Sequence, residues 1–185
     1  GKLPVVVKDS PGFLVNRILV PYLMEAVRLH ASGIPVKDID DAMLEFGMPM
    51  GPMRLLDEIG LDVASHVAKT LAEAFPDRFP KSDVLDKRVA EGHLGKKSGR
   101  GFYRYENGRE IAFTAAPPMP QHESIQTRLA LLISQEAMKC LKEGIARSAV
   151  SRPSRSWTTR NHSSLPCAGR PADSIWRRSS MCALV

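Results

Sequence analysis

The residues of this sequence that could carry chemistry are few and scattered. Its five histidines lack the HExxH or HxxxH spacing that brings two metal ligands to one face of a helix, so no metal site is predicted. The Gly-x-Gly-x-x-Gly fingerprint of a dinucleotide site is absent, and no nucleophile–base pair is defined by spacing. We therefore expect no catalytic, cofactor-binding or metal-binding residue in this chain, and we expect His30 and His66 at a helix surface or an interface.

A glycine-rich stretch at 92–99, GHLGKKSG, resembles a phosphate-binding loop only superficially. Two residues separate its glycines where the motif needs four, and no strand precedes it, so we reject it as a nucleotide site. Lys96, Lys97 and Arg100 could approach a ligand phosphate by charge alone. The pattern favours the simpler interpretation, in which they are solvated loop charges.

One polar residue, Asn16, stands in an otherwise apolar stretch, between Val15 and Ile18-Leu19. Its amide either forms a buried hydrogen bond between helices or lies in a cleft, where it can bind a substrate oxygen. The pattern alone favours the structural interpretation.

The segments that must position these residues are consecutive amphipathic helices. The first is expected from a cap at Asp9-Ser10-Pro11 to a stop at Gly33, with Phe13 on its apolar stripe and a kink at Pro21. Further helices are expected at 35–47, 53–59, 61–75, 83–91 and 121–145. The turn-forming pair Asn107-Gly108 predicts a small hairpin, and three prolines between 117 and 120 predict a linker. The predicted fold class is all-α.

An internal repeat relates the first and last of these helices. With an offset of 111 residues, Arg17 aligns with Arg128, Glu25-Ala26 with Glu136-Ala137, and Gly33-Ile34 with Gly144-Ile145. The five identities are either a coincidence between amphipathic helices or the trace of a duplicated helical domain whose second copy begins near residue 121.

The net charge of +6 over 185 residues is concentrated at one end. Residues 151–185 hold six Arg and one acid, while residues 1–150 hold 20 Lys and Arg against 19 acids. The body thus shows no electrostatic footprint for nucleic acid. No apolar run is long enough to span a membrane, and three cysteines without a CxxC motif favour a reducing, cytoplasmic location. The first residue is not Met, which suggests a piece of a longer protein.

Three ordered motifs carry a family resemblance: KDSPGFLVNRILVPYLMEA, GMPMGPMRLLDEIGLDVA and KKSGRGFYRYENG, within residues 1–108. Together they resemble the C-terminal region of 3-hydroxyacyl-CoA dehydrogenases. The second helical copy is similar to the extended form of that family, the multifunctional fatty-acid oxidation proteins, which join an enoyl-CoA hydratase to the dehydrogenase.

The resemblance implies an all-helical domain of the 6-phosphogluconate dehydrogenase C-terminal type, which packs against a Rossmann domain and forms one wall of the acyl-CoA cleft. The family oxidises 3-hydroxyacyl-CoA to 3-ketoacyl-CoA with NAD, using a His–Glu pair on the Rossmann domain. By the same resemblance Asn16 is the residue that contacts substrate, the GMPMGP loop at 47–52 could line the acyl pocket or simply form a turn, and the helical domains form a homodimer that the second copy imitates.

The expected domains are therefore 1–116, a first helical domain, 121–150, the start of a truncated second copy, and 151–185, an atypical basic tail. The tail departs from the family, and either disorder or a frameshift near residue 150 would explain it. We expect the apolar stripe of the last helix either to self-associate or to dock on the first domain; its members are Leu129, Leu132, Ile133, Ala137, Cys140 and Leu141. The expected function is the substrate-binding and dimerisation part of a dehydrogenase, inactive alone. The alternative is a stand-alone helical interaction module without catalysis.

Overall fold

The computed structural model describes residues 5–79, 83–111 and 122–146. All of them belong to one compact unit, residues 1–147. The proline linker and the basic tail at 151–185 lie outside the described residues, so their predicted character stays a prediction.

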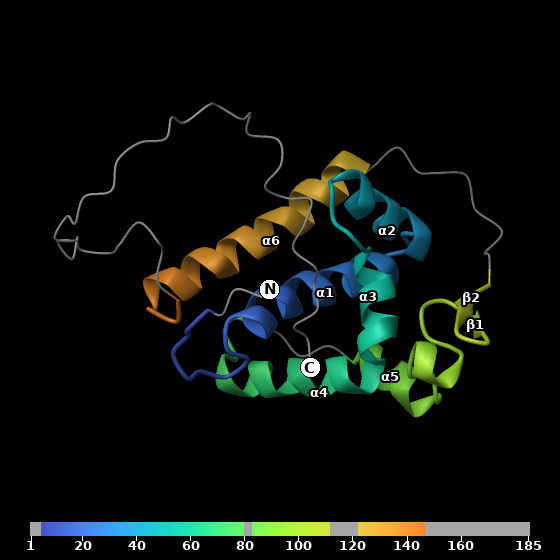
Figure 1. Cartoon of the computed structure of the whole chain (residues 1–185), viewed down its shortest axis with the longest axis horizontal. Coiled ribbons are helices and arrows are strands. Elements are labelled where there is room, and N and C mark those ends of the chain that lie inside the picture. The colour runs from blue at the N-terminus through green and yellow to red at the C-terminus, as the bar shows by residue number, and fades with distance from the viewer. Residues whose placement is uncertain (1–4, 80–82, 112–121, 147–185) are drawn as a thin grey trace, which may run out of the picture. The chain divides into compact units, whose positions relative to one another are not determined.

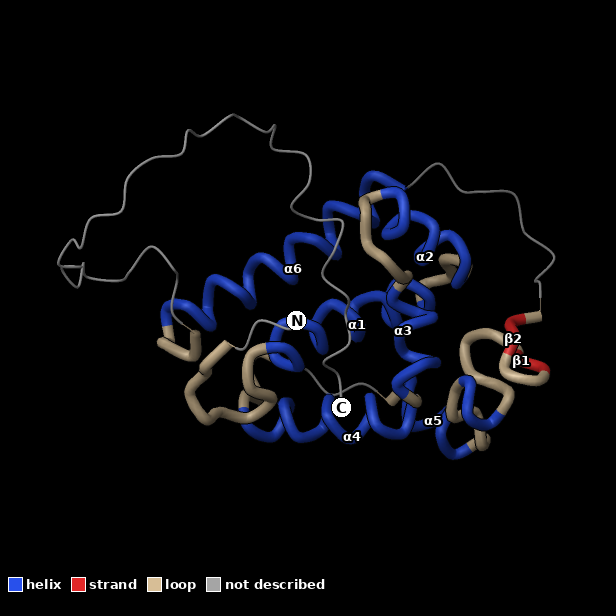
Figure 2. Tube along the Cα trace, viewed as in Figure 1, coloured by secondary structure: helices blue, strands red, loops and turns tan. Residues whose placement is uncertain are grey.

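Helices account for nearly all the regular structure (Figures 1 and 2). They are α1 (Val15–Ala31), α2 (Val36–Glu45), α3 (Pro52–Ile59), α4 (Leu61–Ala74), α5 (Val84–Ala90) and α6 (His122–Lys142), with a 3-10 turn, η1, at Lys96–Ser98. A two-stranded antiparallel hairpin joins β1 (Tyr105–Glu106) to β2 (Arg109–Glu110). The all-α prediction is confirmed, and the hairpin turns at Asn107 and Gly108, whose φ angles of 51° and 75° fit a tight hairpin turn.

The start of the first helix differs from its prediction. Residues 11–14 form a turn, and Gly12 and Phe13 both adopt left-handed backbone angles, with φ of 74° and 49°. A right-handed helix cannot include two such residues, so α1 begins only at Val15. The expected cap is absent, and the Ser10 hydroxyl instead accepts a hydrogen bond from Arg17 at 3.2 Å. The helix continues through Pro21, and the predicted kink there stays a prediction.

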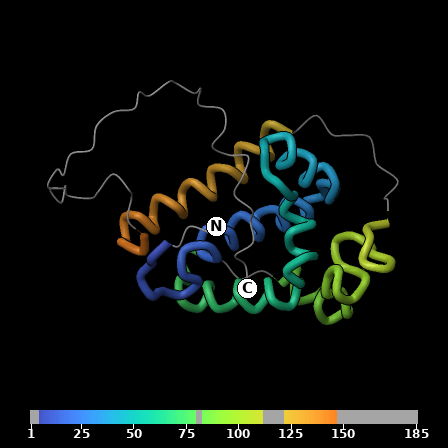
Figure 3. Tube along the Cα trace, viewed as in Figure 1, coloured from blue at the N-terminus to red at the C-terminus, as the bar shows by residue number. Residues whose placement is uncertain are grey.

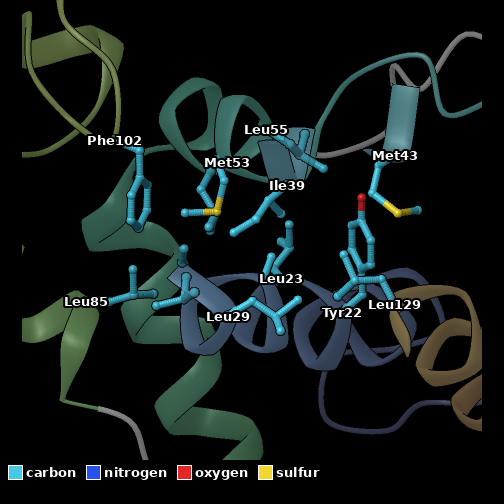
Figure 4. Close-up of a cluster of buried hydrophobic side chains, with 14 of the residues drawn as sticks. Tyr22, Leu23, Leu29, Ile39, Met43, Met53, Leu55, Leu85, Phe102 and Leu129 are labelled. Carbon is cyan, nitrogen blue, oxygen red and sulfur yellow. The ribbon is translucent and has the colours of Figure 1, made fainter. Parts of the chain in front are cut away.

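α1 is the central helix of the unit. It lies between α4 and α6 and also contacts α2 and α3 (Figure 1). One buried apolar cluster joins these elements; Figure 4 shows Phe102 and Leu85 at one end of it and Tyr22, Met43 and Leu129 at the other. Helices from both ends of the described chain therefore contribute to one buried cluster.

α6 runs antiparallel to α1 and closes the unit. Its residues Ile125 and Leu129 are buried in the main cluster, and the amide of Lys8 donates to the carbonyl of Ile145 at 2.9 Å, which brings the two ends of the described chain together (Figure 3). The structure thus shows the docked arrangement of the last helix. Most of the predicted stripe lies on the buried side: Leu129 and Cys140 are buried and Leu132, Ile133 and Ala137 are half-buried, whereas Leu141 is 43% exposed. Ile125 and Glu136 are also buried, although the prediction did not include them.

Two buried carboxylates tie the loops to the helices. Asp40 in α2 accepts hydrogen bonds from the backbone amides of Met53 and Arg54, at 2.8 and 3.1 Å, and from the Tyr103 hydroxyl at 2.8 Å. It thereby satisfies amides at the start of α3 that have no partner within the helix.

Asp57 in α3 has the same role for the arm that follows α5. It accepts from the amides of Phe102 and Tyr103, each at 2.9 Å, and from the Tyr105 hydroxyl at 3.0 Å. Burial raises the pKa of Asp57 above its usual value, against the opposing effect of these hydrogen bonds. The arm at 100–106 is therefore held by a side chain more than forty residues away in sequence.

Candidate functional site

Asn16 lies in the first turn of α1, and its side chain is half-buried. Within the described part of the chain, no hydrogen bond to this amide is recorded, so the buried helix-to-helix bond favoured by pattern alone is not what the structure contains. An amide carries both a donor and an acceptor group. Asn16 is thus available to bind a polar atom supplied from outside the described residues.

The neighbouring Arg17 fixes the direction in which Asn16 points. Its side chain is 1% exposed, forms an ion pair with Glu143 at the end of α6, and places its guanidinium 4.2 Å from the centre of the Phe75 ring. Because consecutive residues of a helix point about 100° apart, anchoring Arg17 between α4 and α6 turns Asn16 away from that interface.

The turn before α1 packs against α4 and so positions the start of α1, where Asn16 lies. Gly12 has a left-handed φ of 74°, which favours glycine, and a Cβ added to it would lie 2.8 Å from the flexible end of the Leu71 side chain. The next residue, Phe13, is 56% exposed although aromatic, and Val15 is 45% exposed. Asn16 therefore lies close in sequence to two exposed apolar side chains. Phe13, predicted on the buried stripe of the first helix, is instead exposed.

Ion pairs hold the two repeat-related helices, α1 and α6, against each other. Arg128 pairs with Glu25 at 2.5 Å, and both belong to the aligned positions of the repeat. At the other end of the interface, Arg78 bridges Glu136 at 2.9 Å and Glu143 at 2.6 Å, and Glu143 also pairs with Arg17. The two arginines hold the pKa of Glu143 below its usual value despite some desolvation. The repeat aligns four charged residues, and all of them lie at or beside this interface: Arg17, Glu25, Arg128 and Glu136.

The glycine-rich loop motifs have a packing role. A Cβ on Gly51, in the GMPMGP loop, would collide with the Asp40 carboxylate, and one on Gly101 would collide with that of Asp57. Met48 and Met50 of the same loop pack against the main cluster. Whether the loop also lines an acyl pocket stays a prediction, but its glycine is explained by the buried carboxylate.

The other residues considered from sequence lie apart from Asn16. Lys96 pairs with Glu58 at 2.5 Å and Lys97 with Asp62 at 2.5 Å, while Arg100 lines a separate cavity near α5. Among the described residues, no group of His, Cys, Asp and Glu is placed to hold a metal ion. The strands described, two residues each, form no βαβ unit, so the described residues do not fit a bound NAD.

A comparison with protein families identifies the family of this chain. The C-terminal domain of 3-hydroxyacyl-CoA dehydrogenase matches residues 12–105, which include Asn16 and all three motifs' central residues. The chain belongs to that family.

Full-length relatives extend the similarity beyond this domain. The chain is 40% identical over 159 residues to the fatty acid oxidation complex subunit alpha of Vibrio cholerae, and 38% identical over 157 residues to that of Vibrio parahaemolyticus. Each alignment covers 80% of this chain and 22% of the relative. The chain therefore spans about a fifth of the length of these curated relatives.

Solved structures of the family share the fold. (S)-3-Hydroxybutyryl-CoA dehydrogenase from Ralstonia eutropha is 42% identical with a TM-score of 0.55, covering 58% of this chain and 39% of its own. The Escherichia coli 3-hydroxybutyryl-CoA dehydrogenase is 38% identical with a TM-score of 0.55, over 65% of this chain and 26% of its own. The dehydrogenase part of a Caenorhabditis elegans multifunctional enzyme, 22% identical with a TM-score of 0.58 over 78% of this chain and 35% of its own, shows the fold alone.

Sequence reasoning missed the supporting residues around Asn16. The burial of Arg17 and the roles of Asp40 and Asp57 depend on partners between 7 and 126 residues away, which no local pattern reveals. One signal was present: glycines at 51 and 101 are each required by an acid that must approach the backbone closely.

Among the described helices, none is long and apolar enough to cross a membrane.

Proposed function

We propose that this chain forms the substrate-binding wall of an NAD-dependent 3-hydroxyacyl-CoA dehydrogenase of fatty-acid oxidation, and that a separate Rossmann domain supplies NAD and the catalytic His–Glu pair. The surroundings of Asn16 support this proposal. Its amide has no hydrogen bond within the described residues, and the buried Arg17 next to it fixes its direction. The exposed side chains of Phe13 and Val15 lie nearby in the sequence. Such a surface suits a second domain that contributes the other half of a cleft.

In this proposal Asn16 binds a polar oxygen of the 3-hydroxyacyl-CoA substrate, and the apolar side chains around it contact the Rossmann domain. The amide orients the substrate so that the carbon-bound hydrogen at C3 faces the nicotinamide, which accepts it as hydride when NAD is bound. The hydroxyl proton goes to the histidine of the Rossmann domain. The described residues offer no group for either transfer, so we propose that the chain is inactive by itself.

We further propose that α6 occupies the position that a partner subunit takes in short family members, which makes the unit a pseudo-dimer. The antiparallel packing of α6 on α1, with Arg128 of α6 paired to Glu25 of α1, supports this arrangement. The buried free thiol of Cys140 is compatible with a reducing compartment, and we propose the cytoplasm as the location.

The test is reconstitution. NADH-dependent reduction of acetoacetyl-CoA is followed for the chain alone, for a separately produced Rossmann domain of a family member, and for their mixture. The proposal predicts activity only in the mixture, saturating with the concentration of this chain. Failure of the mixture to form a complex or to turn over substrate would favour the alternative, a helical interaction module without catalysis.

A further inference from the structure

A cavity of about 740 Å³ lies at the far end of α1 from Asn16, between the start of α2, α5 and the arm at 100–104. Asn16 and His30, one of its lining residues, are separated along α1 by roughly 21 Å at 1.5 Å per residue. Small-molecule sites usually measure about 300–1,000 Å³, so this cavity has the size of a ligand site distinct from the one above.

Positive charge dominates the polar part of the lining. It contains five cationic side chains, Lys37, Lys87, Arg88, Arg100 and Arg104, against the two carboxylates Asp38 and Glu91. Lys37 has an acidic partner, Asp41, on its own helix. For Lys87, Arg100 and Arg104 the described residues include no ion pair, so these cations retain their capacity to bind an anion.

Arg88 is held rigidly at the cavity wall. Its guanidinium lies 4.3 Å from the centre of the Phe102 ring and donates to the Gly101 carbonyl at 3.3 Å and to Nε2 of His30 at 3.1 Å. Since an arginine can only donate, Nε2 of His30 accepts, and its Nδ1 therefore carries the proton donated to the Ile34 carbonyl at 3.0 Å. His30 is thus a neutral support, and three of the five N–H groups of Arg88 remain without a recorded partner in the described structure.

The arginines are also close enough to repel one another. Burial lowers the pKa of Arg88, and the positive charge of Arg100 lowers it further, while Asp57 and Glu91 oppose the shift. Arg88 is half-buried while Lys87, Arg100 and Arg104 are exposed, and an anion between Arg88 and Arg100 would relieve their repulsion. A guanidinium fork matches phosphate oxygens in geometry, and a phosphate dianion matches the surplus of positive charge.

The remaining wall is apolar and comes from Pro35, Val36 and Val84, which are all half-buried. We propose that this cavity binds a phosphomonoester with a ring-shaped body, of the class of a nucleoside monophosphate. Its phosphate lies against Arg88, Arg100 and Arg104, and its ring lies against Val36 and Val84.

The test is a titration of the full chain by calorimetry with three probes: adenosine 5′-monophosphate, adenosine and inorganic phosphate. We expect the monophosphate to bind at least about tenfold more tightly than either of its halves. Equal affinity for the monophosphate and inorganic phosphate would overturn the proposal, because the ring would then contribute nothing.

Variants locate the binding. Arg100→Gln and Arg104→Gln should each weaken binding of the monophosphate by about three- to tenfold, one charged contact being worth roughly a kcal/mol. Lys96→Gln and Lys97→Gln are matched controls, because their ammonium groups pair with Glu58 and Asp62 and do not line the cavity. An equal loss in all four variants would overturn the proposal, since it would show non-specific attraction. Neither outcome depends on Asn16 or on catalysis, so this test and the reconstitution can fail separately.

Discussion

Gly51 lies against the buried carboxylate of Asp40. Gly51 has ordinary extended backbone angles, φ of −70° and ψ of 155°, so backbone strain does not require a glycine there. The requirement is space, because an added Cβ would collide with the Asp40 carboxylate, whose oxygens are held by three hydrogen bonds.

Gly51→Ala is therefore expected to lower the free energy of unfolding by about 3 kcal/mol, the upper range for overpacking a rigid site. In an Asp40→Ala background the same substitution should cost less than about 1 kcal/mol, because the obstructing group is gone. Urea unfolding of the four proteins of this cycle measures the difference. Equal costs in both backgrounds would show that the collision is not the cause.

Asp40 also makes a specific contribution to pH dependence. Burial raises its pKa to about 6, although its hydrogen bonds and Arg54 oppose the shift. Between the unfolded value of 3.8 and about 6, the folded protein holds a proton that the unfolded chain has released. The stability that Asp40 contributes is thus fully present below pH 4 and lost as the pH rises through 6.

We expect the free energy of unfolding of the Asp40→Asn variant, relative to the wild type, to increase by up to about 3 kcal/mol from pH 4 to pH 7. Asp41→Asn, at a neighbouring and more exposed position, should show no such trend. Urea unfolding at four pH values checks this. A constant difference between Asp40→Asn and the wild type across that range would rule out the raised pKa.

At the scale of elements, the sequence predicts where most helices lie, but it only partly predicts which of their side chains are buried. The 3.6-residue period of apolar residues is local, so α2 to α5 lie within one or two residues of their predicted bounds. The start of α1 was missed because Gly12 and Phe13 adopt left-handed angles, which the 3.6-residue period of the apolar residues does not reveal. The buried face of α6 was only partly predicted, since Glu136 is buried by its ion pair with Arg78, a residue of another segment.

The attachment of α6 depends on Arg17, which is buried between α4 and α6. Arg17→Leu should lower the free energy of unfolding by about 1 to 2 kcal/mol, because the ion pair is buried only on the arginine side and Glu143, 39% exposed, keeps Arg78 as a partner. The loss should be concentrated in α6, whose amide hydrogens would exchange faster while those of α3 stay protected. Arg109→Leu, an exposed change in β2, is the control. Unchanged exchange in α6 of the Arg17 variant would show that apolar packing alone holds this helix.

At the scale of the whole molecule, the described unit combines the family domain, residues 12–105, with a further helix docked on it. Family membership could be predicted from three motifs, because glycines and prolines at fixed spacing are specific. The position of Asn16 relative to the rest of a cleft could not, since in our proposal the complementary groups belong to a Rossmann domain.

The most direct measurement is the effect of Asn16→Ala on kcat/KM for acetoacetyl-CoA in the mixture of this chain with a Rossmann domain. Loss of one substrate hydrogen bond in the transition state should reduce kcat/KM by about 10- to 100-fold, with unchanged binding of the two proteins and unchanged melting temperature. Gln135→Ala, which removes an exposed amide from α6, should leave kcat/KM within about twofold of the wild type. A mixture in which Asn16→Ala is as active as Gln135→Ala would contradict the assignment of Asn16 to the substrate.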